Sequence, residues 1–327
     1  MATFKLSPEQ HHNLALFDTG EDLMIQAGAG CGKTSEIVRF FTHMAATRPV
    51  AMGIYVALQK TLAQEVQGSI TSVNVAFAGT IHSLAWTMLR HTHPEYMAMV
   101  AARMPRKKRG PNDKPPLPAY KKPEVVGLVE GVIFTREGKT GITRSKVRYG
   151  KPVVALAPDD VWLSPYMLYQ AAIDTVRRFC MSGEDTITLA HALSAVTVKR
   201  SWAVPHKNRK AIAAVILTGA QGIWADALNS AGQLPYNHDW YLKFWSLCKP
   251  DLMRDGGLAP GSVLFFDEAQ DSKPCVSAVI EHQRTLPGPR IQIVTVGDSA
   301  QAIFGFTGAR DALRDFAAWK DAHHGSL

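Results

Sequence analysis

Eight consecutive residues have the composition of a phosphate-binding loop. They are Ala27, Gly28, Ala29, Gly30, Cys31, Gly32, Lys33 and Thr34. Apolar residues at 23–25 precede them and an amphipathic stretch at 37–44 follows, so the loop joins a predicted strand to a predicted helix. Glycines allow backbone N–H groups to approach phosphate oxygens, and the helix directs the positive end of its dipole at them. Lys33 would then contact the β- and γ-phosphates, and the Thr34 hydroxyl would bind Mg²⁺. The alternative is a loop that only turns the chain.

Two acids form a second candidate group. The apolar run at 263–266 ends directly in Asp267 and Glu268. Mg²⁺-dependent phosphoryl transfer needs one carboxylate to hold the metal and a second group to orient or deprotonate the attacking water. The pattern therefore assigns Asp267 to the metal and Glu268 to the water. Acids that simply face solvent at a strand end are the alternative, and the Lys33-Thr34 loop favours the catalytic assignment.

A third group follows the predicted strand at 291–296. Gln301 lies shortly beyond it, where its amide could hydrogen-bond the γ-phosphate and report its loss. Phe304 and Phe306 stand on either side of a glycine and could stack on nucleic-acid bases, each worth about 1–3 kcal/mol. An exposed loop glutamine and two core phenylalanines are the alternatives.

Thr80 and His82 open a predicted helix. A hydroxyl and the N–H groups at a helix start are suitable ligands for backbone phosphates. Thr80 could equally be an N-cap, and His82 a buried imidazole with its hydrogen bonds satisfied.

These groups must be positioned by the apolar runs that precede them. Such runs lie at 23–25, 54–58, 73–77, 263–266 and 291–296, and helical patterns separate them. Strands alternating with helices predict an α/β fold with a parallel sheet covered by helices on both faces.

Composition narrows the class of protein. The chain has 327 residues, of which 46% are hydrophobic and 20% charged, as in an ordinary globular protein of one large or two medium domains. No uninterrupted run of 18 apolar residues is present, which predicts no membrane span, and the N-terminus lacks the layout of a signal peptide. The four cysteines are too scattered for a disulfide framework or a zinc site. We expect a cytoplasmic, reducing compartment.

The net charge of +8 is unevenly distributed. Residues 96–250 contain 23 Lys and Arg against 11 Asp and Glu, whereas the rest contains 13 against 17. We interpret 96–250 as a mostly helical basic insertion with a polyanion partner, placed between the two parts of an ATP-binding domain, 1–95 and 251–327. Residues 103–122 hold eight basic residues and five prolines, which predicts a mobile loop. Its candidate contacts with that polyanion are Arg106, Lys107, Lys108 and Arg109.

Taken together, the motifs resemble those of UvrD/Rep-type superfamily 1 DNA helicases, in the same order. Residues 6–10, Leu-Ser-Pro-Glu-Gln, are similar to the adenine-reading Q motif. Residues 27–34 are similar to the Walker A form A-x-x-G-x-G-K-T, which accounts for alanine where the general pattern begins with glycine. Residues 80–85 resemble the single-strand-binding motif, 267–271 resemble Walker B, and 296–309 resemble motif III.

The resemblance implies a RecA-like P-loop NTPase fold that uses ATP and Mg²⁺ and acts on single-stranded and forked DNA. By this resemblance Gln10 reads adenine, Glu268 is the general base and Gln301 senses the γ-phosphate. Thr80, His82 and Phe306 would contact single-stranded DNA. The basic middle would contact the duplex ahead of the fork, with an affinity that falls steeply with salt.

A closer similarity is to the F-box DNA helicase branch, through His-Asp-Trp-Tyr-Leu-Lys-Phe-Trp at 238–245, although no F-box is apparent. Thr307 stands where motif III usually has arginine. The family also places a second RecA-like lobe after motif III, whose arginines contribute about 10³–10⁵ in rate. The chain stops at Leu327, so we expect weak hydrolysis by this lobe alone and a second protein as a candidate source of the other.

Three functions follow from these patterns. The leading one is an ATP-dependent DNA helicase acting in repair or recombination, or its N-terminal half. The second is a non-translocating, ATP-gated DNA-binding module that regulates or recruits a partner; Lys33, Asp267 and Glu268 oppose it, since pure binding needs no base. The third is an ATPase subunit that acts with a nuclease in phage defence or recombination.

Overall fold

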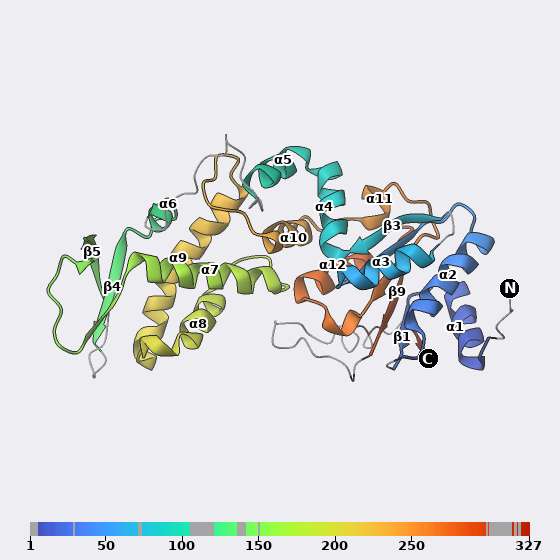
Figure 1. The fold of residues 1–327 in the computed structure, drawn as a ribbon, viewed down its shortest axis with the longest axis horizontal. Helices are drawn as coiled ribbons and strands as arrows, with labels where there is room; N and C mark the ends of the chain where they lie inside the picture. The colour runs from blue at the N-terminus through green and yellow to red at the C-terminus, as the bar shows by residue number, and fades with distance from the viewer. Residues whose placement is uncertain are drawn as a thin grey trace. The chain divides into compact units, whose positions relative to one another are not determined.

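The five apolar runs near the two ends of the chain form one six-stranded sheet together with a polar strand at 323–326 (Figure 1). The computed structural model describes residues 6–28, 30–70, 74–104, 121–135, 142–149, 151–298, 300, 316, 319 and 322–327. The strand order is β10-β1-β9-β8-β2-β3, and every neighbouring pair is parallel. The strands are β1 (Leu23–Gln26), β2 (Gly53–Ala57), β3 (Val75–Thr80), β8 (Val263–Asp267), β9 (Gln292–Gly297) and β10 (His323–Ser326). The predicted α/β class with a parallel sheet is confirmed.

The chain divides into two units. The sheet unit combines Met1–Pro94 with Leu242–Leu327, and the inserted unit is Glu95–Tyr241. The sequence predicts the second boundary after residue 250, whereas the structure has it inside α10 (His238–Leu247).

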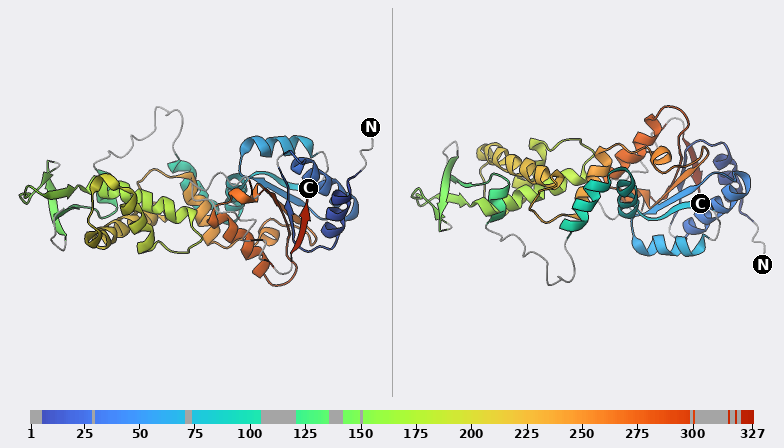
Figure 2. Two further views of the ribbon diagram at one scale, coloured as in Figure 1. Left: turned by 90° about the horizontal axis from the view of Figure 1, so that it is seen from below. Right: turned by 90° about the horizontal axis from the view of Figure 1, so that it is seen from above.

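Helices lie on both sides of the six-stranded sheet (Figure 2). They include α1 (Pro8–Asp18), α2 (Lys33–Thr47), α3 (Lys60–Ser69), α4 (Ile81–Thr92), α11 (Leu252–Asp255) and α12 (Pro274–Thr285). Ser7 caps α1 and Pro8 occupies its first turn, a position where the missing N–H of proline costs nothing. Helices on both sides explain why β2, β8 and β9 are buried along their whole length.

Aromatic side chains pack the core between α1, α2 and the sheet. The ring centroids of Phe17 and Phe40 are 4.8 Å apart, and those of Phe41 and Phe265 are 4.5 Å apart. A Cβ atom at Gly53 would lie 2.1 Å from the Phe41 ring, so only glycine lets β2 approach α2 this closely. This packing fixes α2, and with it the loop that precedes α2.

The sequence did not predict β10, the polar strand at residues 323–326. The strand β10 pairs in parallel with β1, from Leu23 opposite His323 to Gln26 opposite Ser326. Its sequence, His-His-Gly-Ser, carries no apolar signal. The contact that places it is long-range, because Asn13 of α1 donates a hydrogen bond to the Ser326 carbonyl at 3.2 Å.

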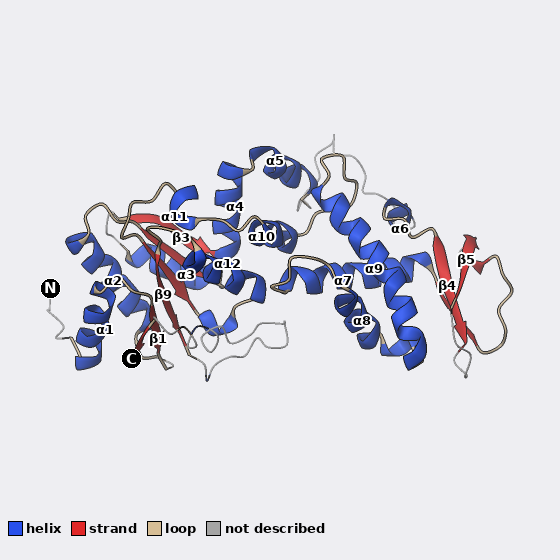
Figure 3. Ribbon diagram, turned by 180° about the vertical axis from the view of Figure 1, so that it is seen from behind, coloured by secondary structure: helices blue, strands red, loops and turns tan. Residues whose placement is uncertain are grey.

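The inserted unit is helical, as predicted, but it also contains strands (Figure 3). Its helices are α5 (Pro94–Arg103), α6 (Lys122–Val125), α7 (Pro165–Met181), α8 (Leu189–Val198), α9 (His206–Leu228) and the start of α10. A four-stranded antiparallel sheet in the order β6-β5-β4-β7 accompanies them. Its strands are β4 (Glu130–Thr135), β5 (Thr143–Arg148), β6 (Lys151–Pro152) and β7 (Asp160–Leu163).

Helix α9 has the length and apolar composition of a membrane-spanning helix, although the sequence has no uninterrupted apolar run of that length. In the structure it packs against α7 and α8, and Ile212, Ile216, Ala220 and Ile223 are fully buried there. It also carries Asp226 near its end, a costly residue inside a lipid bilayer. Its apolar composition is therefore that of a core helix.

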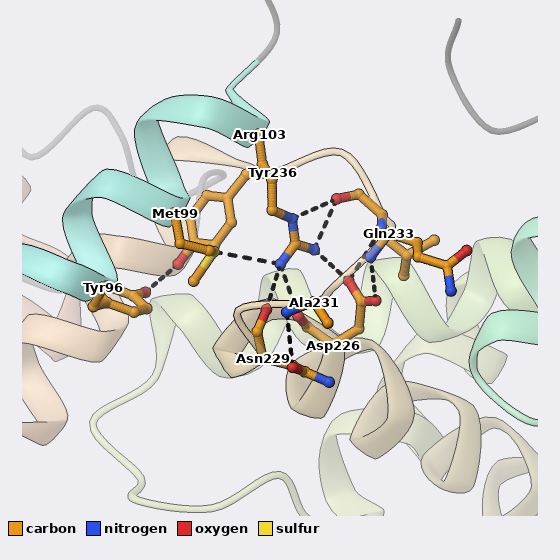
Figure 4. A network of polar contacts seen from close by, with 9 residues as sticks. Tyr96, Met99, Arg103, Asp226, Asn229, Ala231, Gln233 and Tyr236 are labelled. Atoms are coloured by element: carbon orange, nitrogen blue, oxygen red, sulfur yellow. Dashed lines mark hydrogen bonds and ion pairs between the residues drawn. The ribbon is translucent and has the colours of Figure 1, made fainter. Parts of the chain in front are cut away.

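A network of hydrogen bonds and an ion pair surrounds Arg103 at the C-terminal end of α9 (Figure 4). The Arg103 guanidinium pairs with the Asp226 carboxylate and also donates to the carbonyls of Asn229 and Leu234, at 3.2 and 2.8 Å. Asp226 in turn accepts from the backbone N–H groups of Gln233 and Leu234, at 2.7 and 3.1 Å. The buried charges are therefore satisfied on both sides, and they tie α5 to the loop that follows α9.

Candidate nucleotide site

The loop between β1 and α2 contains two glycines with positive φ angles. Gly30 and Gly32 have φ angles of 72° and 84°, in the left-handed region that favours glycine. Gly32 is also the N-cap of α2, so no side chain caps the first turn, and its N–H groups can receive an anion. The structure does not describe Ala29. These features are compatible with a phosphate loop, and the phosphate-binding role of residues 27–34 stays a prediction.

Ala27 anchors the start of this loop. It is fully buried in the aromatic core, and its N–H donates to the Gly297 carbonyl at 2.9 Å. The hydrogen bond connects the end of β1 to the end of β9, its neighbour in the sheet. Alanine thus fills core space at the position where the general pattern has glycine.

The Lys33 ammonium faces the Glu268 carboxylate. Its Nζ lies 3.0 Å from Oε1 and 3.2 Å from Oε2 of Glu268. Both side chains remain partly accessible, at 13% and 21%. The pair joins the phosphate loop to the end of β8, so residues 235 positions apart in the sequence share one site. The positive charge that the sequence assigns to phosphate contact is thus paired with the candidate base.

Glu268 stands in a strained backbone position. Its φ angle is 53°, in the left-handed region that non-glycine residues rarely adopt. The residue links β8 to a short 3₁₀ helix at Ala269–Asp271, and Gln270 Nε2 donates to its carboxylate. Strain of this kind is found most often at functional sites.

Asp267 is buried at the end of β8 and held from two sides. The Tyr55 hydroxyl, on β2, donates to its Oδ2 at 2.8 Å, and the Glu268 N–H donates to Oδ1 at 2.9 Å. Burial raises the pKa of Asp267 to about 6, while the Tyr55 hydrogen bond lowers it. Burial and the Asp267 carboxylate both raise the pKa of Tyr55, so its hydroxyl stays protonated and acts as the donor.

Sequence reasoning missed Tyr55 as part of this site. The signal was present, because a tyrosine in the apolar run at 54–58 must find a partner for its hydroxyl once the strand is buried. Which partner it finds depends on the pairing of β2 with β8, where Tyr55 lies opposite Phe265.

A second set of hydrogen bonds connects this site to the end of β9. Gln270 accepts the N–H of Asp298 at 3.1 Å, and Asp298 accepts from the Gln26 amide at 3.4 Å and the Ala300 N–H at 2.9 Å. The ends of β1, β8 and β9 are thereby linked by side chains at one edge of the sheet. Ligands of open α/β folds bind at this carboxyl edge.

Gln10 lies in the first turn of α1. Its Oε1 accepts the Ser7 N–H at 3.0 Å, and the Ser7 hydroxyl accepts the Gln10 N–H at 3.2 Å. This reciprocal pair is a capping box, which fixes both the helix start and the orientation of the amide. The adenine-reading role of Gln10 stays a prediction.

Thr80 is the N-cap of α4, one of the two alternatives raised by the sequence. Its Oγ1 accepts the Ser83 N–H at 3.3 Å, and the Ser83 hydroxyl completes a capping box. His82 is half-buried in the first turn of the same helix. A capping role does not exclude a contact with nucleic acid, and that contact stays a prediction for both residues.

Several predicted site residues lie outside the described residues. They are Gln301, Phe304 and Phe306 after β9, and Arg106, Lys107, Lys108 and Arg109 in the basic loop. Of the site residues that the structure describes, Lys33, Asp267 and Glu268 are brought together, whereas no hydrogen bond joins Thr34 to Asp267 within that part of the chain.

Comparison with known proteins identifies the family. Residues 15–307 match the family model described as an AAA domain. The chain belongs to this family. It is also 24% identical over 321 residues to F-box DNA helicase 1 of Gallus gallus, an alignment that covers 96% of this chain and 25% of that protein. Both matches support the resemblance to superfamily 1 helicases that the sequence motifs indicate, and that resemblance is confirmed.

The chain thus spans a quarter of the length of that relative. The alignment runs through the inserted unit as well as the sheet unit, because it covers nearly the whole chain.

Proposed function

We propose that the chain is the ATP-binding lobe of a UvrD/Rep-type DNA helicase, in which ATP hydrolysis drives movement along single-stranded DNA. The observation that carries the proposal is the Lys33–Glu268 ion pair, 3.0 Å long, because it joins a phosphate-binding loop to a strand-end acid in one site. Binding nucleotide would transfer Lys33 from Glu268 to the β- and γ-phosphates. Glu268 would then be released to orient or deprotonate the attacking water.

The residues present fit Mg²⁺. The Asp267 carboxylate and the Thr34 hydroxyl are hard oxygen donors, and each Asp267 oxygen has a lone pair beyond the one that accepts a hydrogen bond. No cluster of three His, Cys, Asp or Glu side chains suited to a metal occurs within the described ranges. Water and nucleotide phosphates would therefore supply the remaining ligands, as is usual for this ion. When bound, Mg²⁺ would neutralise charge on the phosphates.

Tyr55 would act as a positioning residue for this ion. Tyr55→Phe keeps the buried ring but removes the donor to Asp267 Oδ2. Loss of a group that orients a metal ligand typically weakens metal binding or activity 10- to 100-fold. We expect the Mg²⁺ concentration for half-maximal ATP turnover to rise by about tenfold, measured by titration at saturating ATP.

Tyr169→Phe is the matched control, because Tyr169 is a buried tyrosine of the inserted unit. An unchanged Mg²⁺ requirement in Tyr55→Phe, with only a loss of stability, would reduce Tyr55 to a packing role.

The helicase proposal is tested by ATP turnover with and without single-stranded DNA. We expect turnover by the 327-residue chain to be slow and to rise when an oligonucleotide is added. Nucleotide binding is measured in parallel by equilibrium titration. Tight ATP binding with no turnover under either condition would instead support a non-translocating, ATP-gated DNA-binding module. Absence of ATP binding would overturn both.

A further inference from the structure

The inserted unit carries an exposed basic hairpin. Strands β5 and β6 pair in antiparallel fashion, with Arg148 opposite Lys151 and Val147 opposite Pro152. Residues 138–158 contain no acidic residue. The hairpin therefore concentrates positive charge in a short segment that the proposed nucleotide chemistry does not use.

The basic side chains share one face of this hairpin. Alternate residues of a strand point to the same side, so Arg144, Lys146 and Arg148 lie together, and Lys151 joins them as the partner of Arg148. All four are exposed. The intervening Ser145 is buried, and its Oγ accepts the Val153 N–H at 3.1 Å. Glu130, opposite Lys146 on β4, offsets only part of this charge.

The spacing of these charges suits a phosphodiester chain. Side chains two residues apart on a strand repeat every ~6.7 Å. That distance is comparable to the separation of successive phosphates along an extended nucleic-acid strand. Neighbouring basic side chains can thus contact neighbouring phosphates while the nucleic-acid strand stays extended.

An aromatic ring occupies the tip of the hairpin. Tyr149 is 92% exposed, and the Arg148 guanidinium carbon lies 5.6 Å from the centroid of its ring. Its φ angle is 51°, a conformation that turns normally assign to glycine or asparagine. A tyrosine thus occupies a backbone conformation that disfavours it, at a position that leaves most of the residue exposed. An exposed ring beside cationic groups is the arrangement on which unpaired bases stack.

We propose that this hairpin face, formed by Arg144, Lys146, Arg148, Tyr149 and Lys151, binds single-stranded nucleic acid. The basic side chains contact successive phosphates, and the Tyr149 ring stacks on an unpaired base. The inference rests on the proposed function, in so far as the chain acts on DNA. It adds the surface that binds. It also assigns single-stranded nucleic acid to the inserted unit, for which the family resemblance implies contacts with duplex DNA.

Two sets of variants of the full chain separate stacking from charge. Tyr149→Asn removes the ring but introduces a residue well suited to a positive φ, so the turn should fold at least as well. Tyr149→Trp keeps a stacking surface. The charge variant combines Arg144→Gln, Lys146→Gln and Arg148→Gln. Its matched control combines Lys121→Gln, Lys207→Gln and Lys210→Gln, three exposed basic residues of the same unit.

Affinity is measured by fluorescence anisotropy with an oligothymidine and with an abasic oligonucleotide of equal length. Tyr149→Asn should weaken oligothymidine binding about fivefold or more and leave abasic binding unchanged, and Tyr149→Trp should restore it. The charge variant should weaken both and lower the slope of log K against log salt by about 2, since each phosphate contact on a single strand contributes ~0.7.

Three outcomes would overturn the hairpin proposal. One is equal loss in the charge variant and its control, which would mean non-specific attraction. Another is unchanged oligothymidine binding in Tyr149→Asn. The third is competition by polyglutamate as effective as by oligonucleotide, which would indicate an acidic protein partner. If the wild-type chain binds no oligonucleotide at all, the proposed DNA function fails, so the two failures are distinguishable.

Discussion

Lys33→Ala should raise the dissociation constant for ATP by about 10- to 150-fold, the range expected for losing a hydrogen bond to a charged group. Lys33 carries the only charged side chain in the sequence of the loop, residues 27–34, and its ammonium lies 3.0 Å from the Glu268 carboxylate. Removing it has a second effect, because the Glu268 carboxylate would then face the incoming phosphates without a counter-charge. Isothermal titration with ATP measures the loss.

A double-variant cycle isolates that second effect. If Glu268 repels nucleotide once Lys33 is gone, Lys33→Ala combined with Glu268→Gln should bind ATP more tightly than Lys33→Ala alone. Equal affinity of the two would show that the carboxylate does not face the phosphates. Lys60→Ala, an exposed lysine at the start of α3, is the control and should leave ATP affinity unchanged.

Glu268→Gln should reduce ATP turnover by about 10²- to 10⁴-fold, the usual contribution of a general base. Binding should respond in the opposite direction. Since Lys33 no longer has to leave a carboxylate partner, we expect ATP to bind at least as tightly as to the wild type. The separation of turnover from affinity is the signature of a group that acts on the water rather than on the nucleotide.

Single-turnover hydrolysis and equilibrium binding together measure these two quantities. Glu65→Gln, an exposed carboxylate of α3, serves as the control for the same chemical change. Retained turnover in Glu268→Gln would remove Glu268 from the catalytic role and leave the Lys33 ion pair as a structural contact.

Local features of the fold could be predicted because they depend on neighbouring residues. The glycines at 30 and 32 supply positive φ angles that the turn requires, and β2, β8 and β9 follow from unbroken apolar runs. The sequence missed β10, whose polar residues are held by pairing with β1, and the four-stranded sheet of the inserted unit. Both were missed because such strands depend on partner strands elsewhere in the chain, or carry only a weak alternation of apolar and polar residues.

The sequence by itself determined the glycine-rich loop that ends in Lys33 and Thr34, the strand that ends in Asp267 and Glu268, and the excess of positive charge in the middle of the chain. Only the tertiary structure decided that Lys33 meets Glu268, across 235 residues, and that Tyr55 meets Asp267, across 212. Such contacts are set by the order and register of strands in the sheet, which no local pattern encodes. The same holds for the basic hairpin, where cross-strand pairing adds Lys151 to the face of Arg148.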